Sequence, residues 1–130
     1  MKKNCILLYG CMLVLALAIS GAVSAAQKGQ ISHMVLVWLK EPGNQAMRNQ
    51  FVAASRSLND LPGIVNRHVG IVLPSDRNVV DDSFDVAVTV TLRDKAAFDA
   101  YMNNPKHKRV VAEKLKPLVG KIIVYDMVSE

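Results

Sequence analysis

The chain has 130 residues, 51% of them hydrophobic, and a formal net charge of +5 at pH 7. This length suits one compact domain and excludes a multidomain enzyme with a separate cofactor domain. Residues 1–26 contain Lys2, Lys3 and both cysteines, Cys5 and Cys11, so residues 27–130 have a net charge of only +3 and no cysteine. A disulfide, a thiolate metal site and a cysteine nucleophile are therefore excluded from that part, and its mild positive charge does not indicate a nucleic-acid partner.

The N-terminal segment is typical of an export signal. Two lysines precede an apolar run over residues 6–19, and small residues follow it up to Ala26. This order predicts a secretory signal peptide at residues 1–26, cleaved after Ala25 or Ala26. The run is shorter than the roughly 20 residues that span a bilayer, so no stable membrane anchor is expected after cleavage. We therefore expect the domain 27–130 to be periplasmic or secreted.

A strand and a helix come next. Residues 31–39 are almost continuously apolar and rich in branched side chains, which predicts a buried strand ended by Pro42 and Gly43. Asn44 is the expected N-cap of the helix, and Pro62-Gly63 its stop. Between them, five apolar residues recur at helical spacing and define one buried face. These residues are Met47, Phe51, Ala54, Leu58 and Leu61.

Two strands follow the helix. Residues 64–73 and 83–93 predict strands, and the polar, turn-rich connection 74–82 favours an antiparallel hairpin between them. The second strand alternates strictly between apolar and more polar residues, so one face of it is expected in the core. The apolar residues of this alternation are Phe84, Val86, Val88, Val90 and Leu92.

Two short helices and a last strand complete the domain. Asp94 is expected to cap a helix that runs through Met102, and Asn103 or Asn104 to cap a second one that has Pro105 in its first turn. The segment 117–120 ends that helix, and residues 121–128 form the last strand. The order β-α-β-β-α-β, with the second helix split, predicts a ferredoxin-like α+β sandwich with an antiparallel sheet.

The first strand is apolar on both of its faces. One face carries Val35 and Val37, and the other carries Met34, Leu36 and Trp38. Helices cover only one face of a ferredoxin-like sheet, so the second set would form an exposed apolar patch on a lone domain. We therefore predict a homodimer packed sheet on sheet, with Met34, Leu36 and Trp38 in the interface.

Three polar side chains are expected to reach one space between helices and sheet. His107 begins a helical stripe that continues with Val111, Tyr101 lies on the buried side of the short helix, and His33 shares a strand face with Val35. An unpaired buried polar group costs about 1 to 3 kcal/mol, so these side chains bond one another, bond the backbone or line a hydrated cavity. In a cavity, imidazole and phenol together suit proton transfer at a carbonyl. Packing into the core, with each polar group bonded to nearby backbone, is the alternative.

A cluster of cations opens the last helix. Lys106, Lys108 and Arg109 lie in its first turn, where positive charge opposes the helix dipole by about 0.3 to 1 kcal/mol. A solvated cluster tolerates this small cost. Alternatively, these side chains and free backbone N–H groups form an anion site for a carboxylate or phosphate beside His107.

Three aspartates surround the end of the predicted hairpin connection. Asp81, Asp82 and Asp85 are typical of a solvated turn, and no cysteine or paired histidine accompanies them. We therefore predict no metal site. Weak binding of a hard cation such as Mg²⁺ through carbonyls and waters stays open.

The order and spacing of several motifs resemble the stress-responsive A/B barrel (Dabb) family. The motifs are His33 and Lys40 at the two ends of the first strand, the turn Leu61-Pro62-Gly63-Ile64, and Tyr101, Pro105 and His107 in a Y-x-x-x-P-x-H spacing. The resemblance covers nearly all of residues 27–130 and implies a dimeric α+β barrel. Most members of the family have no assigned reaction.

One branch of that family implies roles for individual residues. In plant polyketide cyclases, similar to olivetolic acid cyclase, the tyrosine and histidine of this spacing act on a linear polyketide without a cofactor. The resemblance assigns those roles to Tyr101 and His107, and it matches His33 to the first-strand histidine. A further pocket histidine of those enzymes corresponds by position to Val86, which argues against the same substrate.

Three functions follow from the residues and the resemblance. The leading one is an exported Dabb homodimer, without cofactor, that binds a small acidic or aromatic compound between helices and sheet. The second is a cyclase-like or lyase-like enzyme in which His107 transfers a proton, Tyr101 polarises a carbonyl and His33 orients the substrate. The third is a stress-protective structural dimer with a filled core and no ligand.

Overall fold

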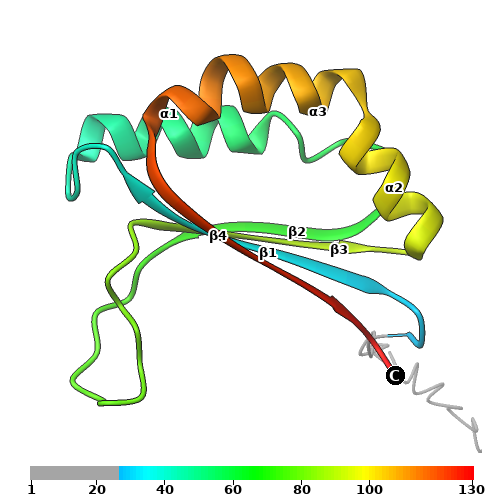
Figure 1. Ribbon diagram of the computed structural model, residues 1–130, viewed down its shortest axis with the longest axis horizontal. Coiled ribbons are helices and arrows are strands. Elements are labelled where there is room, and N and C mark those ends of the chain that lie inside the picture. The colour runs from blue at the N-terminus through cyan, green and yellow to red at the C-terminus, as the bar shows by residue number, and fades with distance from the viewer. Residues whose placement is uncertain (1–26) are drawn as a thin grey trace, which may run out of the picture.

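The computed structural model describes residues 27–130 (Figure 1), and the predicted export signal with both cysteines lies outside the described residues. Nine elements follow one another: β1 (Ile31–Leu39), α1 (Gln45–Arg56), β2 (Ile64–Ile71), β3 (Val86–Leu92), α2 (Lys95–Asn103), α3 (Pro105–Val110), a π-helical turn η1 (Val111–Leu115), a 3₁₀ turn η2 (Lys116–Leu118) and β4 (Val119–Val128). This order confirms the predicted ferredoxin-like α+β fold. Within the described part, no helix is both long enough and apolar enough to cross a membrane.

The four strands form one antiparallel sheet in the order β2-β3-β1-β4, and all the helices lie on one face of it (Figure 1). The predicted hairpin is confirmed, because β2 pairs with β3 in antiparallel register. Across the sheet, Val69 lies opposite Val88, Val88 opposite Val35, and Val35 opposite Val124. Opposed residues point to the same side, so this row faces the helices and forms part of the floor beneath them.

The core lies between the helix layer and the sheet. The alternation in β3 buries Val86, Val88, Val90 and Leu92 while their neighbours stay partly exposed, as predicted. From the helix side, Phe51 on α1 is 3% exposed. Burial of a side chain of this size contributes about 1.5 to 3 kcal/mol, so these contacts fix the helix layer over the sheet.

The predicted helix caps are confirmed where they could be specified. The side chain of Asn44 accepts a hydrogen bond from the backbone N of Met47, and Asp94 accepts one from the backbone N of Ala97. Of the two candidates for the next cap, Asn104 fills the role, because its Oδ1 accepts from the backbone N of Lys106 and of His107. These caps set the start of each helix and therefore the direction in which its side chains point.

Several element ends differ from the sequence prediction. α1 ends at Arg56, before the predicted stop at Pro62-Gly63, and the turns that follow it still bury Leu58 and Leu61. The apolar pattern continued beyond the helix because those turns face the core. The connection between β2 and β3 spans residues 72–85 and is longer than predicted.

The longer connection has a local cause at Asp85. Its buried carboxylate accepts hydrogen bonds from the backbone N of Leu39 (2.8 Å) and of Gly43 (3.0 Å). These bonds tie the residue before β3 to the end of β1. The side chain of Asp85 therefore closes the loop after β1, while its backbone N donates to the carbonyl of Val37 and its carbonyl accepts from the backbone N of Val72.

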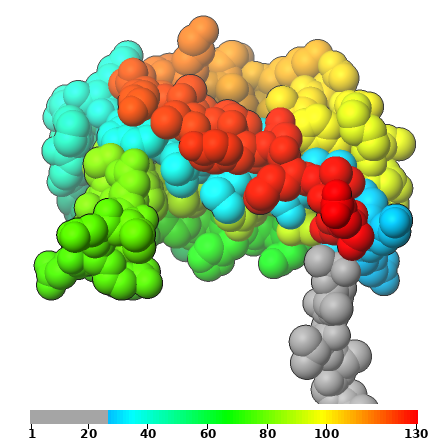
Figure 2. Space-filling view, turned by 60° about the horizontal axis from the view of Figure 1, so that its bottom comes forward, coloured from blue at the N-terminus to red at the C-terminus, as the bar shows by residue number. Residues whose placement is uncertain are grey.

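The sheet face opposite the helices carries a partly exposed apolar surface, which is turned toward the viewer in Figure 2. Met34 and Leu36 lie on this face opposite Tyr125 and Ile123 of β4, and Tyr125 is 51% exposed. Trp38 is partly covered within its own chain: Nζ of Lys121 lies 4.2 Å from its ring centroid, and the ring of Phe84 packs edge-on to it. The predicted interface residues therefore lie on the face that no helix covers, and their contact with a second copy stays a prediction.

Candidate functional site

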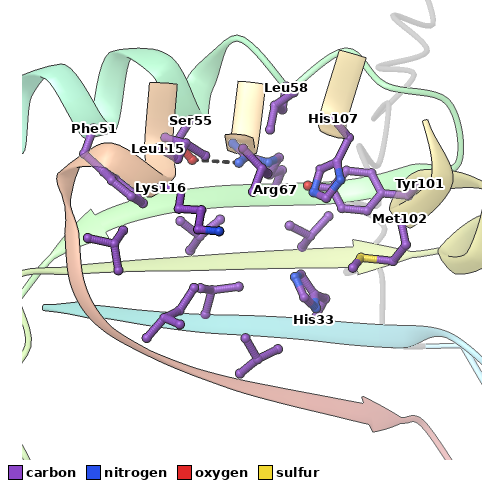
Figure 3. Close-up of a pocket in the computed structure, with 17 residues that line it drawn as sticks. His33, Phe51, Ser55, Leu58, Arg67, Tyr101, Met102, His107, Leu115 and Lys116 are labelled. Carbon is purple, nitrogen blue, oxygen red and sulfur yellow. Dashed lines mark hydrogen bonds between the residues drawn. The ribbon is translucent and has the colours of Figure 1, made fainter. Parts of the chain in front are cut away.

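A cavity of about 340 Å³ lies between the helix layer and the sheet (Figure 3). Its floor comes from all four strands and its roof from α1, α2, α3, η1 and η2. Apolar side chains form most of its wall, and five polar side chains join them. The polar residues are His33, Ser55, Arg67, Tyr101 and His107, with the exposed Lys116 beside them.

The structure brings together the three residues that the sequence proposed as a site. His33 on β1, Tyr101 on α2 and His107 on α3 all line the cavity (Figure 3). The ring centroids of Tyr101 and His107 are 4.5 Å apart, and those of His33 and Tyr101 are 6.3 Å apart. Tyr101 is 3% exposed, His33 7% and His107 9%, so all three side chains are buried where they line the cavity. Their catalytic roles stay a prediction.

The break between α2 and α3 explains why Tyr101 and His107 meet. Asn104 has an extended backbone between the two helices, and its side chain starts α3. Pro105 occupies the first position of α3, where its missing N–H is not needed. The chain therefore turns between the two helices and returns the His107 ring over the Tyr101 ring.

His33 is held by a carboxylate that the sequence analysis did not single out. Nδ1 of His33 donates a hydrogen bond to Oδ1 of Asp126, 2.6 Å away, and the two residues lie opposite each other on β1 and β4. A carboxylate partner fixes the protonated nitrogen of an imidazole and leaves the other nitrogen as an acceptor. Nε2 of His33 is therefore the nitrogen available to a ligand. Asp126 could not be recognised from the sequence alone, because its pairing with His33 depends on how the first and last strands are aligned in the sheet.

His107 is 9% exposed, and its Nδ1 is buried without a hydrogen-bond partner. Burial lowers the pKa of His107 below its ordinary value, repulsion from Arg67 and from the imidazolium form of His33 lowers it further, and a backbone hydrogen bond with Met102 offsets part of this effect. Desolvation and like charges both disfavour the imidazolium form. At neutral pH the ring is therefore neutral and able to accept or donate one hydrogen bond.

Arg67 is a cavity residue that sequence reasoning missed. It lies on β2 opposite Val90, which in turn lies opposite His33, so Arg67 and His33 share one row across the sheet. Its guanidinium donates to Oγ of Ser55 and to Oδ1 of Asn59, each at 2.8 Å. The apolar Val69 and Ile71, two and four residues later, were the sequence signals for an inward arginine, and the register shift between Ile64 and Asn66 breaks their alternation with the start of the strand.

The predicted anion cluster lies outside the cavity wall. Nζ of Lys106 binds Asp60 at 2.9 Å, and Nζ of Lys108 donates to Oδ1 of Asn103 at 3.1 Å. Arg109 is exposed. The anion site at these three residues stays a prediction, and the structure does not bring it together with the three cavity rings.

Two aspartates of the β2–β3 connection make hydrogen bonds within that loop. Oδ1 of Asp81 accepts from the backbone and hydroxyl of Ser83, and Asp82 accepts from the backbone N of Ser75. Among residues 27–130, no three histidine, aspartate or glutamate side chains gather closely enough to hold a metal ion. Val86, the position of the further cyclase histidine, is fully buried in the core.

The fold and the cavity define a small α+β protein with a mostly apolar cavity that carries a few polar side chains. Residues 31–129 match the family described as the stress responsive A/B barrel domain, Dabb. The match spans most of the chain, so the protein belongs to the Dabb family, as the motifs indicated. The comparison with curated proteins gives no match.

Solved structures share the fold at low sequence identity. A Dabb family protein with a ferredoxin-like fold from Mesorhizobium loti has a TM-score of 0.65 and 24% identity, covering 79% of this chain and 99% of its own. Hydroxynitrile lyase from Passiflora edulis has a TM-score of 0.68 and 22% identity, covering 80% and 96%. A dimeric ferredoxin-like protein from Thermobifida fusca has a TM-score of 0.64 and 20% identity, covering 82% and 96%.

Proposed function

We propose that the protein is an exported homodimer that binds a small acidic or aromatic compound in the cavity between its helices and its sheet. The observation that carries this proposal is the cavity itself, with His33, Tyr101 and His107 in an otherwise apolar wall. A mostly apolar cavity of this size with a few convergent polar groups is typical of a small-molecule site. An open cavity also argues against the structural alternative, which requires a filled core.

Binding is tested by NMR titration of the ¹⁵N-labelled domain 27–130 with two aromatic probes, benzoate and benzamide. We expect shifts in the resonances of residues that line the cavity, such as Val88 and Tyr101. Val124→Trp places a large ring at the cavity wall and should abolish the shifts, whereas Ala53→Trp on the exposed side of α1 should leave them unchanged. Shifts confined to residues outside the cavity, or no shifts with either probe, contradict the proposal.

Export rests on the layout of residues 1–26. The full chain, expressed in a bacterial host, should reach the envelope and lose this segment. Intact mass of the recovered protein should correspond to a start at Ala26 or Gln27. Envelope material that still begins at Met1 contradicts the proposal.

Catalysis is the second candidate, and the pairing of His33 with Asp126 favours it. Asp126 orients His33 toward the substrate, neutral His107 accepts or returns a proton, and Tyr101 donates a hydrogen bond to a carbonyl oxygen. These roles suit cleavage or formation of a bond next to a carbonyl, by a cyclase-like or lyase-like reaction. The fold of the Passiflora edulis hydroxynitrile lyase supports the lyase form.

The lyase form is tested with mandelonitrile as the probe, which a lyase converts into benzaldehyde and hydrogen cyanide. Release of benzaldehyde is followed by its absorbance. A general acid or base contributes about 10²-fold to 10⁴-fold, so His107→Ala should lower kcat by a factor in this range. Full turnover in His107→Ala contradicts the assigned role, and absence of turnover in the unaltered protein contradicts the lyase form while leaving the binding proposal intact.

A further inference from the structure

The residues that line the cavity are more cationic than anionic, since the carboxylate of Asp126 contacts the wall through His33 but does not line it. Two of the lining residues, Arg67 on β2 and Lys116 on η2, are cationic, and no aspartate or glutamate lines the cavity. The ion pairs among residues 27–130 engage other basic side chains: His33, Arg93, Lys95 and Lys106. A bound ligand would therefore meet a net positive field in a largely apolar space, where charge is weakly screened.

Arg67 is held in place by neutral partners. Its two terminal nitrogens donate to Ser55 and Asn59, and neither acceptor carries a charge. Ser55 is 1% exposed, so the bond to its hydroxyl fixes the guanidinium against α1 (Figure 3). The third nitrogen, Nε, is buried without a hydrogen-bond partner. Arginine at this position therefore keeps its full charge, the Nε–H donor and the second N–H of each terminal nitrogen.

A second buried nitrogen in the cavity wall, Nδ1 of His107, also lacks a hydrogen-bond partner. His107 is 9% exposed. Figure 3 shows the side chains of Arg67, Tyr101 and His107 directed toward one space, with His33 below them on β1. Unpaired buried polar atoms are rare in folded proteins, and two in one cavity wall point to a polar group that belongs there when the site is filled.

From these contacts we infer that the compound bound in the cavity is a monocarboxylic acid with an apolar body, and that Arg67 binds its carboxylate. This inference rests on the proposed function and names the class of ligand. Arginine matches a carboxylate through charge-assisted hydrogen bonds, and its planar fork suits that group. Neutral His107 supplies an N–H to the same carboxylate or to an adjacent polar group of the ligand.

The rest of the wall sets the size and character of the acid. Val88, Val90 and Val35 form an apolar floor, and Phe51 and Leu58 add apolar surface from α1. A cavity of about 340 Å³ holds an aromatic or short aliphatic body. The carboxylate therefore binds within the cavity, in contrast to the surface anion site predicted at Lys106, Lys108 and Arg109.

The test compares benzoate with benzamide, which have nearly the same shape and differ in charge. Dissociation constants come from the NMR titrations of the domain 27–130 at pH 7. We expect benzoate to bind at least about tenfold more tightly than benzamide, since about 1.4 kcal/mol of charge-assisted bonding gives that factor. The Nε–H resonance of Arg67, which reports on the guanidinium directly, should move with benzoate and stay in place with benzamide.

Variants separate the role of Arg67 from general positive charge. Arg67→Gln should bring the two dissociation constants to within about twofold of each other, and Arg67→Lys should restore only part of the preference because it lacks the planar fork. Lys106→Gln, which removes one charge of the predicted surface cluster, separates that cluster from the cavity, and Lys28→Gln, at an exposed lysine outside both, is the matched control; both variants should keep the full preference. Circular dichroism of each variant confirms that it is folded.

The outcomes distinguish failure of the role of Arg67 from failure of ligand binding in the cavity. Equal binding of the two probes to the unaltered protein, or an unchanged preference in Arg67→Gln, overturns the role of Arg67 and leaves cavity binding intact. A preference that disappears in Lys106→Gln and not in Arg67→Gln moves the anion site to the surface cluster and also overturns it. No binding of either probe overturns the inference together with the proposed function.

Discussion

At the scale of single residues, the cavity contains two histidines that differ in the hydrogen bonding of Nδ1. Asp126 anchors His33 through a 2.6 Å hydrogen bond, whereas Nδ1 of His107 has no partner. One imidazole is therefore fixed in tautomer and orientation, and the other is free to adapt to a ligand. The row Asp126, His33, Val90 and Arg67 runs across all four strands, so the sheet register places a carboxylate and a guanidinium at its two ends.

Loss of the carboxylate should release His33. In Asp126→Ala, Nδ1 of His33 loses its acceptor, and the neutral ring should shift toward the tautomer protonated at Nε2. Two-dimensional NMR of the imidazole nitrogens reports this change directly. The side chain of Asp126 is 47% exposed, so we expect a loss of only about 1 kcal/mol in the free energy of unfolding. An unchanged tautomer in Asp126→Ala would show that the carboxylate does not control His33.

His107 should make the stability of the protein depend on pH. Burial lowers its pKa in the folded state, whereas in the unfolded chain it titrates near 6.5. As pH falls below about 6.5 the unfolded chain binds a proton that the folded protein does not, so the free energy of unfolding decreases, by at most about 1.4 kcal/mol per pH unit. Above that pH the contribution is constant.

The contribution of His107 is isolated by comparing His107→Gln with the unaltered protein. Urea unfolding at pH 7.5, 6.5 and 5.5 gives the free energy of unfolding of each. As the pH falls, the free energy of unfolding of the unaltered protein should decrease relative to that of His107→Gln. A difference that stays constant over this range contradicts a lowered pKa.

At the scale of elements, the turn before β2 brings β2 and α2 together. Gly63 has a φ of +85°, and a Cβ built there would lie 2.7 Å from Cβ of Ala97 on α2. This close approach positions β2, which carries Arg67, beside α2, which carries Tyr101. The turn therefore supports two walls of the cavity at once.

Gly63→Ala should destabilise the protein through both backbone strain and this contact. A positive φ costs an alanine about 1 to 2 kcal/mol, and the displaced Ala97 adds to that. Gly43 has a φ of +76° with nothing within 4 Å of a built Cβ, so Gly43→Ala is the matched control for strain alone. Urea unfolding should show a larger loss for Gly63→Ala, by about 1 kcal/mol or more. Equal losses would mean that the contact with Ala97 relaxes without cost.

The sequence predicted the elements better than their ends and their partners. Periodicity and caps located β3 and the break at Asn104, because these depend on local chemistry. The pairing of His33 with Asp126 and the inward position of Arg67 depend on strand order and on a register shift, which a single sequence does not encode locally. The three predicted rings met in one cavity because each already lay on an apolar face of its own element.

At the scale of the whole molecule, the sheet face without helices carries apolar side chains that the predicted second copy would cover. Met34 and Leu36 on β1 lie beside Tyr125 and Ile123 on β4, forming a continuous apolar strip on that face. The connection 72–85 projects on the same side of the sheet (Figure 1), and its Leu73 is 82% exposed. Some structures that share the fold are described as dimeric, and a sheet-on-sheet dimer of this chain stays a prediction.

A charge in this strip should separate the two copies. Leu36→Glu places a carboxylate where the two sheets would meet, and burying an unpaired charge costs several kcal/mol, enough to shift a micromolar sample to monomer. Light scattering at about 10 µM should give the mass of a dimer for the domain 27–130 and of a monomer for Leu36→Glu. Ala53→Glu, which adds the same charge on the exposed side of α1, should stay dimeric. Because the cavity lies on the other face of the sheet, the monomeric variant should keep its ¹⁵N spectrum around Tyr101. A monomeric mass for the unaltered domain would contradict the dimer and leave the exposed strip to another partner.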